Sequence, residues 1–189
     1  DSLAKVQPPI QHFRDDLKEY GELRNAIVHK RSGNMPIAEP HLEVVTHLEF
    51  IASALTSPPQ LEVRFLKAVK ACSSKDEIAD VLAAMTQRSC NQLPVYDNGR
   101  MVGLLTADAV TRWLGAVFDA GENVDRRTLV RDILSYGAQH DYAILSRHAT
   151  VFDARAVLEG CYKKGRRIKA LIITQNGLSS EDPLGIVTT

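Results

Sequence analysis

Residues 93–106 read Leu-Pro-Val-Tyr-Asp-Asn-Gly-Arg-Met-Val-Gly-Leu-Leu-Thr, and this stretch decides the fold of the chain. Two runs rich in apolar residues stand on either side of the pair Asn98-Gly99. Asparagine followed by glycine favours a two-residue hairpin turn, because both residues tolerate the positive φ that such a turn requires. The sequence therefore predicts a β-hairpin whose strands cover residues 93–96 and 101–106.

Helical patterns flank the predicted hairpin. Ahead of it, apolar residues recur at helical spacing, at Ile78, Val81, Leu82 and Met85. Ser74 and Glu77 stand where a capping box would open that helix. A strand-like stretch at 66–72 precedes the helix, and a second helix at 107–118 follows the hairpin. The expected order of elements is therefore β-α-β-β-α.

The same order of elements recurs in the second half of the chain. A strand-like stretch at 143–146 and a helix from about 151 precede two apolar runs, 169–174 and 184–188, around Asn176-Gly177. The residues that we match between the halves are 73 to 82 positions apart: Ser73 and Ser146, Ile78 and Val151, Asp80 and Asp153, Tyr96 and Ile173, and Gly103 and Gly185. The growing offset indicates insertions before the second hairpin and in its turn, where loops tolerate them.

The duplicated unit resembles the CBS (cystathionine β-synthase) domain, and two units in tandem resemble a Bateman module. The resemblance covers residues 61–189 and is carried by 93–106 and, more loosely, by 170–173 with 183–188. It implies an α+β fold in which two β-α-β-β-α CBS repeats pack as a pseudo-twofold pair, preceded by an N-terminal helical hairpin. It also implies two clefts, each able to hold AMP, ADP, ATP or S-adenosylmethionine as a regulatory ligand. No cofactor or metal is required.

The ribose-binding signature of that family is glycine, two apolar residues and a hydroxyl residue, followed three positions later by aspartate. Here Gly103-Leu104-Leu105-Thr106 is followed by Asp108, one position early. A hydroxyl and a carboxylate at a helix start can accept from ribose hydroxyls, and free helix N–H groups favour phosphate. The alternative is that Thr106 and Asp108 cap the following helix. In the second repeat the sequence ends at Thr188-Thr189, before the aspartate position.

Other cleft residues follow from the resemblance. The first strand of each repeat is expected to lend backbone groups to the base edge, and the second strand to pack on the purine face. The expected ligand-binding residues are Lys70, Ala71, Cys72, Leu93, Pro94, Thr106, Asp108, Ala143, Ile144, Leu145, Lys169, Ala170 and Thr188. The apolar members are equally expected to be core. The basic run Lys163-Lys164 and Arg166-Arg167 forms a solvated helix end or contributes a phosphate contact.

The first part of the chain reads as two helices, at 11–30 and 41–55, and Ser57-Pro58-Pro59 marks a boundary after them. The expected domains are therefore an N-terminal segment at 1–59, a first repeat at 60–120 and a second at 121–189. Two helices of this size cannot bury their apolar stripes against each other alone. They need further sequence or a second chain, so we expect a homodimer formed through the helices and the repeats.

Leu23 to His29 resembles the Arg-Asn-x-x-x-His motif of the HEPN superfamily, whose members are often metal-independent ribonucleases. In that reading Arg24 stabilises the phosphate charge, His29 is the general acid/base, and Asn25 completes the motif. Helical periodicity places Arg24 within the apolar stripe, away from Asn25 and His29. The structural alternative is that Arg24 pairs with Asp16 or Glu19 and that His29 is an exposed histidine near a helix end.

The composition limits the function further. Lys+Arg and Asp+Glu both number 23, so no basic field recruits nucleic acid. The three cysteines lack zinc-type spacing, and an odd number without a signal peptide favours a reducing cytoplasm. No apolar stretch is long enough to span a bilayer. We expect a fragment of a longer protein, because the chain lacks an initiator methionine and stops in a strand-like run.

The sequence therefore predicts a cytoplasmic regulatory protein that senses an adenosine-containing ligand and is not itself an enzyme. Two alternatives remain open. One is a nucleotide-regulated ribonuclease that uses Arg24, Asn25 and His29 and has RNA as its partner. The other is a scaffold whose repeats dimerise without a ligand.

Overall fold

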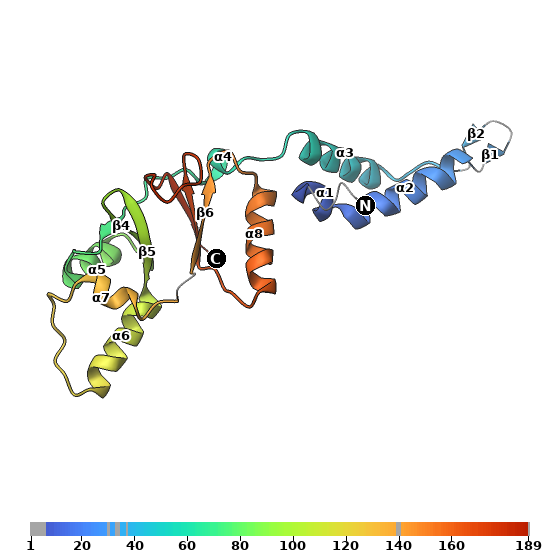
Figure 1. The fold of residues 1–189 in the computed structure, drawn as a ribbon. Helices are drawn as coiled ribbons and strands as arrows, with labels where there is room; N and C mark the ends of the chain where they lie inside the picture. Colours follow the sequence, from blue (N-terminus) through green and yellow to red (C-terminus); the bar gives the residue numbers. More distant parts are fainter. Residues whose placement is uncertain (1–6, 30, 33–34, 37, 139–140, 189) are drawn as a thin grey trace. The chain divides into compact units, whose positions relative to one another are not determined.

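A computed structural model of the chain describes residues 7–29, 31–32, 35–36, 38–138 and 141–188 (Figure 1). The chain divides into two compact units. The first comprises Asp1–Pro59 with Thr150–Ala156, and the second comprises Gln60–Ala149 with Val157–Thr189. Helices and two small three-stranded sheets make the fold α+β, as predicted.

The first unit is helical, with a short two-stranded ribbon. Helices α1 (Pro8–His12), α2 (Arg14–His29) and α3 (Leu42–Thr56) account for most of it, and β1 (Arg31–Ser32) pairs antiparallel with β2 (Met35–Pro36). The expected helix at 11–30 thus begins earlier, at a proline suited to a helix start, and is interrupted at Phe13. The buried core of the first unit includes Phe13, Ile51, Ala54 and Phe152.

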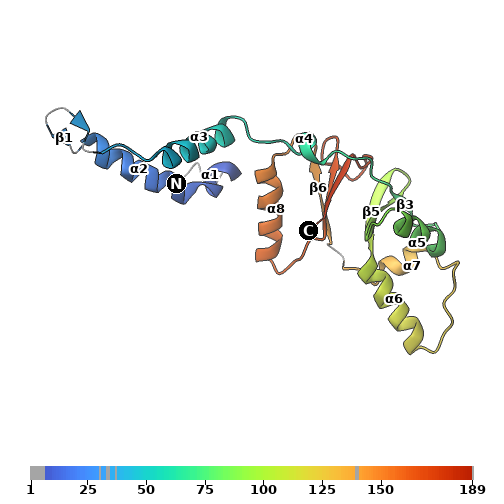
Figure 2. The same ribbon diagram turned by 180° about the vertical axis from the view of Figure 1, so that it is seen from behind.

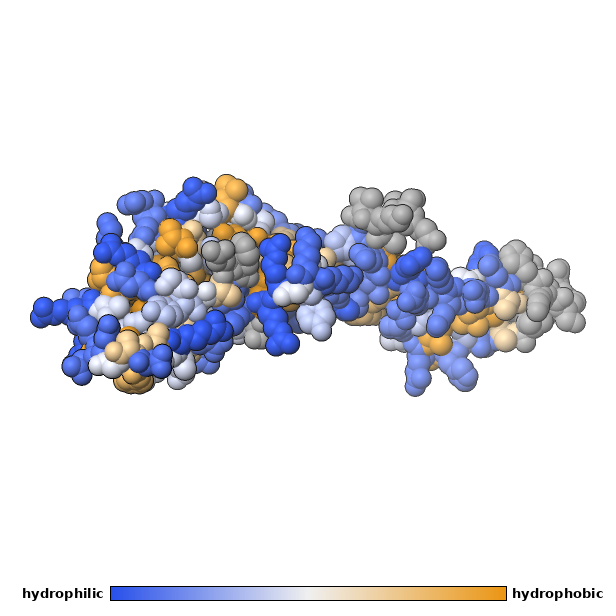
Figure 3. All heavy atoms as spheres, turned by 60° about the horizontal axis from the view of Figure 1, so that its bottom comes forward, coloured by the Kyte–Doolittle hydropathy of each residue, from blue (hydrophilic) through white to orange (hydrophobic). Residues whose placement is uncertain are grey.

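Much apolar surface of this unit stays exposed. Leu23, Leu42, Leu48 and Phe50 are exposed, and Figure 3 shows apolar side chains reaching the surface among polar ones. Arg24 lines an apolar groove together with Tyr20 and Ile27 of the predicted stripe, but its side chain is exposed rather than buried. Its Nη1 donates to Asn25 Oδ1 at 3.3 Å, not to a carboxylate. An arginine on the stripe reaches water on its long stem, so it needs no buried partner.

The first repeat is built around the predicted hairpin. Strands β4 (Gln92–Asp97) and β5 (Arg100–Thr106) pair antiparallel, and β3 (Cys72–Ser73) adds parallel to β4. Asn98 and Gly99 have φ of 49° and 73°, the two positive values of the expected tight turn. Helices α5 (Ile78–Gln87) and α6 (Ala107–Asp119) precede and follow this hairpin.

Two local predictions in this repeat were wrong. The strand expected at 66–72 is reduced to β3, because the segment that follows helix α4 (Leu61–Phe65) is irregular up to residue 71, apart from an isolated bridge of Leu66 to Gly185. The capping box is not formed either, and Ser74 instead donates through its hydroxyl to Asp97. Helix α5 does not need a side-chain cap, because Ile78 N and Ala79 N donate to the carbonyls of Thr128 and Arg126 at 2.8 and 3.3 Å.

The second repeat copies the first. Helix α7 (Val130–Leu134), β6 (Tyr142–Ser146), α8 (Val151–Lys163), β7 (Ala170–Thr174) and β8 (Gly185–Thr188) follow in the same order, and the sheet order β6-β7-β8 matches β3-β4-β5. Ile173 lies opposite Gly185 as Val95 lies opposite Gly103. The counterpart of Ile173 is therefore Val95, and our match to Tyr96 was one residue off.

The repeats exchange their short leading helices. Helix α7 packs on β5, where a Cβ on Gly103 would lie 3.1 Å from Leu134 Cδ1. Helix α4 packs on β8, where a Cβ on Gly185 would lie 2.3 Å from the carbonyl oxygen of Phe65. The anchoring bonds match as well, since Val130 N donates to Asp76 O at 3.0 Å and Leu61 N to Ala149 O at 2.8 Å. Each repeat thus supplies the short helix that packs on the last strand of the other repeat.

Among the described residues of the second unit, two apolar layers involve the first repeat. Helices α5, α6 and α7 cover one face of the first sheet (Figure 2), around a core that includes Val95, Leu105, Trp113 and Ile133. The second layer joins the two repeats and contains Met101, Leu104, Ala170 and Ile172. The loop between β7 and β8 docks on the first hairpin, where Met101 N donates to Ser179 O at 2.7 Å. The two repeats therefore form one compact body with a shared interface.

Candidate functional site

A cavity of about 600 Å³ in the second unit is lined by residues of both repeats. This volume falls within the range of about 300 to 1,000 Å³ that is usual for small-molecule sites. The lining residues come from three places in the fold: the turn before β4, the junction of β5 with α6, and strands β7 and β8 with their flanks. They are Ser89, Cys90, Asn91, Gln92, Thr106, Ala107, Asp108, Lys169, Ile186 and Thr188.

The turn before β4 forms one wall. Ser89 adopts a positive φ of 50°, which ends α5, and Cys90 N donates to Met85 O at 3.0 Å. Asn91 O then accepts from Ala107 N at 2.9 Å, so this turn is tied to the first residue of α6. These backbone bonds leave the side chains of Asn91 and Gln92 at the cavity as hydrogen-bonding groups.

Thr106 joins β5 to α6. Its side chain is buried, and its oxygen accepts from Ala109 N at 3.2 Å as the N-cap of the helix. The capping alternative is therefore present in the structure. Capping uses the hydroxyl as an acceptor, so its hydrogen stays available to donate to a molecule in the cavity. The N-terminus of α6, which carries the positive end of the helix dipole, also faces this space through Ala107.

Asp108 does not act as a cap but forms an ion pair with Lys169 of the other repeat. The hydrogen bond from Lys169, and secondly its charge, hold the pKa of Asp108 below its usual range. Lys169 is held at its backbone, because its N donates to Asp141 O at 2.6 Å and its O accepts from Gln92 Nε2 at 3.3 Å. The pair therefore connects the repeats across the cavity.

Equivalent positions of the two repeats meet in the lining. Thr106 lies opposite Gln92 in the first sheet, and Thr188 lies opposite Ala170 in the second. Thr106 and Thr188 thus end matching strands, and both line the cavity. By the same register Asn91 is the counterpart of Lys169. The cavity accordingly contains a hydroxyl from each repeat at the same strand position.

The cavity brings together four of the expected site residues: Thr106, Asp108, Lys169 and Thr188. The others do not line it: Lys70, Ala71, Cys72, Leu93, Pro94, Ala143, Ile144, Leu145 and Ala170. Leu93 packs into the core of the first repeat, and Ala170 lies between the sheets. Burial, and secondly the charge of Asp76, raises the pKa of the Cys72 thiol to about 12.

Sequence reasoning missed six lining residues: Ser89, Cys90, Asn91, Gln92, Ala107 and Ile186. A signal for two of them was available in the hairpin pairing. Gln92 faces Thr106 across β4 and β5, and Asn91 precedes it. Extending the predicted strand by one residue from Leu93 would have placed Gln92 beside the expected ribose-binding hydroxyl.

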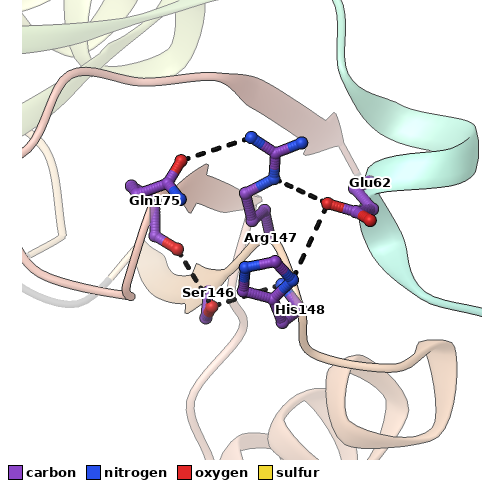
Figure 4. Close-up of polar contacts among 5 residues, drawn as sticks. All are labelled: Glu62, Ser146, Arg147, His148 and Gln175. Atoms are coloured by element: carbon purple, nitrogen blue, oxygen red, sulfur yellow. Dashed lines mark hydrogen bonds and ion pairs between the residues drawn. The ribbon is translucent and has the colours of Figure 1, made fainter.

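A second polar cluster fixes helix α4 on the second repeat (Figure 4). Arg147 Nε donates to Glu62 Oε2 at 2.6 Å, and Arg147 Nη1 donates to Gln175 Oε1 at 3.3 Å. Ser146 Oγ donates to Gln175 O at 3.1 Å, and His148 Nδ1 lies 3.7 Å from Glu62 Oε2. The side chains of Arg147 and Glu62 are 32% and 26% exposed, so the pair is partly shielded from water. These contacts hold α4 in place rather than form a reaction centre.

The N-terminal motif is only partly described. Arg24 and Asn25 are exposed and in contact, whereas the side chain of His29 lies outside the described residues. Among the residues that the structure describes, no group of three or more histidine, cysteine, aspartate or glutamate side chains could hold a metal ion. In the same residues, no helix is long and apolar enough to cross a membrane.

Comparison with known proteins supports the fold. Residues 64–116 match the family model of the CBS domain. Protein MJ1225 from Methanocaldococcus jannaschii is similar over 89% of this chain and 60% of its own, with 16% identity and a TM-score of 0.54. AcuB from Vibrio cholerae, assigned to acetoin utilization, is similar over 68% of this chain and 83% of its own, with 13% identity and a TM-score of 0.51. No curated protein matches the sequence.

A third similar structure is the CBS domain pair of protein MJ0100, which was solved with 5′-methylthioadenosine and S-adenosyl-L-methionine. It covers 69% of this chain and 90% of its own, with 17% identity and a TM-score of 0.49. At these identities the likenesses to MJ1225 and AcuB show the fold alone.

Proposed function

We propose that this chain is a regulatory protein that binds an adenosine-containing ligand in the cavity between its two CBS-like repeats. AMP, ADP, ATP and S-adenosylmethionine are the ligands proposed. The protein acts in the cytoplasm, where its three free cysteines stay reduced. Binding rather than catalysis is its role, and the occupancy of the cavity is passed to the N-terminal helices.

The cavity itself carries this proposal. It is lined by both repeats and places Thr106 and Thr188, the last residues of matching strands, around one space. An apolar side chain filling the space would instead favour a scaffold that has lost its ligand. The lining here is rich in hydroxyl, amide and charged groups, which are the groups that fix a small polar molecule.

Each part of an adenosine ligand has a complementary group in the lining. The Thr106 hydroxyl and the Asp108 carboxylate suit the ribose hydroxyls, because they donate to and accept from them. The start of α6 suits a phosphate, because helix N-termini favour anions. Ile186 and the amides of Asn91 and Gln92 suit a purine, which presents an apolar face and a polar edge.

The exchanged helices supply a route for a signal. A ligand that touches both repeats can favour one relative orientation of them, by as much as its affinities for the two orientations differ. Strand β8 lines the cavity with Ile186 and Thr188 and carries α4 at Gly185. Helix α4 follows the Ser57-Pro58-Pro59 segment directly. Movement of β8 would therefore act on the connection to the first unit.

Calorimetric titration tests the binding. The wild-type chain is titrated with AMP, ADP, ATP, S-adenosylmethionine and cyclic di-AMP, and saturable binding of at least one is expected. Thr106→Ala should weaken that binding, whereas Thr106→Ser, which keeps the hydroxyl, should not. Thr86→Ala is the matched control, because Thr86 is exposed, bonds within its own helix and does not line the cavity. Heat of binding from none of the five ligands would refute the proposal.

A second proposal is that the N-terminal unit is a ribonuclease regulated by the repeats. The contact of Arg24 with Asn25 favours it, because two residues of the Arg-Asn-x-x-x-His motif are adjacent and exposed on α2. Cleavage of single-stranded RNA by the wild type, and its loss in both His29→Ala and Arg24→Ala, is the expected result. Equal cleavage by His29→Ala would exclude this role for the motif.

A further inference from the structure

We propose that Lys169 makes the cavity selective for nucleoside phosphates over uncharged nucleosides and S-adenosylmethionine, and that the ligand opens its pairing with Asp108. This inference rests on the proposed function and narrows its ligand class. It depends on three features of the cavity: which charges line it, how Lys169 is held, and what each candidate ligand offers the pair.

The charge pattern of the cavity is simple. Among the described residues that line it, Asp108 and Lys169 are the charged ones, and the other eight carry no charge. The two come from different repeats and contact each other through Oδ2 and Nζ. Any discrimination between ligands by their charge must therefore involve this pair.

The backbone of Lys169 is fixed by hydrogen bonds, whereas its side chain and that of Asp108 are free to move. The backbone of Lys169 is fixed by Asp141 O and by Gln92 Nε2. Its ammonium group lies at the end of a four-carbon stem and can move while the backbone stays in place. The Asp108 side chain is 61% exposed and the Lys169 side chain 30%. An ion pair with this exposure contributes little stability, so a ligand can separate it at low cost.

A nucleoside phosphate can replace both halves of the pair. Its vicinal ribose hydroxyls donate to Asp108, and its phosphate oxygens accept from the Lys169 ammonium in a charge-assisted bond. The ribose hydroxyls of adenosine can bind Asp108 in place of Lys169, but adenosine has no anionic group to bind Lys169 in place of Asp108. S-adenosylmethionine brings a sulfonium and an ammonium against a single carboxylate, so its charge is positive overall and its interaction with Lys169 is weaker than that of a phosphate. The pair therefore favours AMP over the other two ligands.

The test compares affinities for AMP, adenosine and S-adenosylmethionine in the wild type, Lys169→Met and Lys169→Arg. Lys169→Met should weaken AMP binding by about tenfold or more, as expected for loss of one charge-assisted contact. Adenosine binding should stay equal or improve, because Asp108 is released from its partner. Lys169→Arg should restore the preference for AMP. Lys67→Met, which removes an exposed lysine outside the cavity, should change neither affinity.

Asp108→Asn provides a second and independent variant. It keeps the size of the side chain but removes the charge that competes for Lys169, so the ratio of AMP to adenosine affinity should rise. Because each ratio is measured within one variant, partial misfolding cannot imitate it, and thermal melts report on folding separately. An equal loss of AMP and adenosine binding in Lys169→Met would overturn this inference alone. Failure of the wild type to bind any of the three ligands would overturn it together with their proposed binding.

Discussion

At the residue scale, the sequence predicted side chains best where their role depends on near neighbours. Asn98 and Gly99 form the expected turn because their positive φ values are a local property of the two residues. Lys169 was expected at the purine face, yet it pairs with Asp108, a residue 61 positions away. That partnership depends on how the two repeats dock, and no local pattern records it.

Glu181 makes the docked loop between β7 and β8 sensitive to acid. Hydrogen bonds, first from the backbone N–H of Asn176 and then from its side-chain amide, lower the pKa of Glu181 to about 2. A carboxyl with a lowered folded pKa stabilises the fold above its unfolded pKa, and this contribution is lost as the pH falls through the folded value. The stabilisation from Glu181 should therefore be complete above about pH 5 and disappear between about pH 4.3 and 2.

Denaturant unfolding of the wild type and Glu181→Gln from pH 7 to pH 2.5 measures this contribution. The wild type should be the more stable at pH 7, and the difference should shrink below pH 4. A difference that stays constant over the whole range would show that Glu181 keeps its ordinary pKa. Asp182→Gln, at the exposed neighbouring position, serves as the control.

The thiol of Cys72 should react slowly with alkylating reagents in the native protein. Its thiol donates to Pro94 O at 3.8 Å, and burial raises its pKa to about 12. Because the thiolate is the nucleophile, alkylation of Cys72 by iodoacetamide at pH 8 should be much slower in the native protein than in denaturant. Peptide mass spectrometry of timed samples measures both rates. Similar rates in the two conditions would contradict the half-buried position of Cys72.

At the scale of elements, the sequence predicted the hairpins and the longer helices and missed the short ones. The strand pairs β4-β5 and β7-β8 and helices α5, α6 and α8 lie close to their expected ranges. Each carries enough residues for a periodic pattern to show. Helices α4 and α7 contain five residues each, too few for such a pattern. They form because each packs on a strand of the opposite repeat, and such a tertiary contact leaves no local pattern in the sequence.

Gly185 is where this exchange can be tested. An added Cβ would lie 2.3 Å from the carbonyl oxygen of Phe65, so Gly185→Ala must push α4 away from β8. The expected loss is about 1 to 3 kcal/mol of unfolding free energy, as for other overpacked sites. Gly115→Ala is the control, because Gly115 lies within α6 with open space around it. It should stabilise by about 0.5 to 1 kcal/mol through helix propensity.

Chemical denaturation of both variants measures these opposite effects. The two substitutions add the same methyl group, so a loss seen in Gly185→Ala alone reports the crowding at that site, where Phe65 O is the nearest atom and Ile173 Cδ1 the next. If Gly185→Ala is as stable as the wild type, α4 does not pack on β8. The proposed route from the cavity to the first unit would then have no physical basis.

At the scale of the whole molecule, the duplication was predictable and the state of the N-terminal helices was only partly so. The two repeats could be matched residue by residue, because their strands and helices recur in order. The pattern of α2 and α3 indicated apolar stripes but not what covers them. Phe13, Ile51 and Ala54 are buried together with Phe152 of the later chain, so part of the stripe is covered by a segment far away in the sequence.

The remaining apolar surface of the first unit predicts self-association. A groove of about 250 Å³ between α2 and α3 is lined by Arg24 and by apolar side chains, including Tyr20, Leu23, Ile27, Val44 and Leu48. On α3, Leu42 is 79% exposed and Phe50 is 59% exposed. Apolar patches of this kind mark interaction sites, because leaving them in water costs free energy that association recovers. We therefore expect the chain to form a homodimer in which α2 and α3 of two copies pack together.

Sedimentation velocity over a hundredfold range of concentration tests this expectation. The wild type should sediment as a dimer, and Leu48→Glu should shift it toward the monomer by at least tenfold in dissociation constant, about 1.4 kcal/mol. Glu49→Gln changes the neighbouring exposed position without adding a charge to the groove and should leave the dimer intact. If Leu48→Glu sediments like the wild type, the groove is not the interface, and the two helices must be covered in another way.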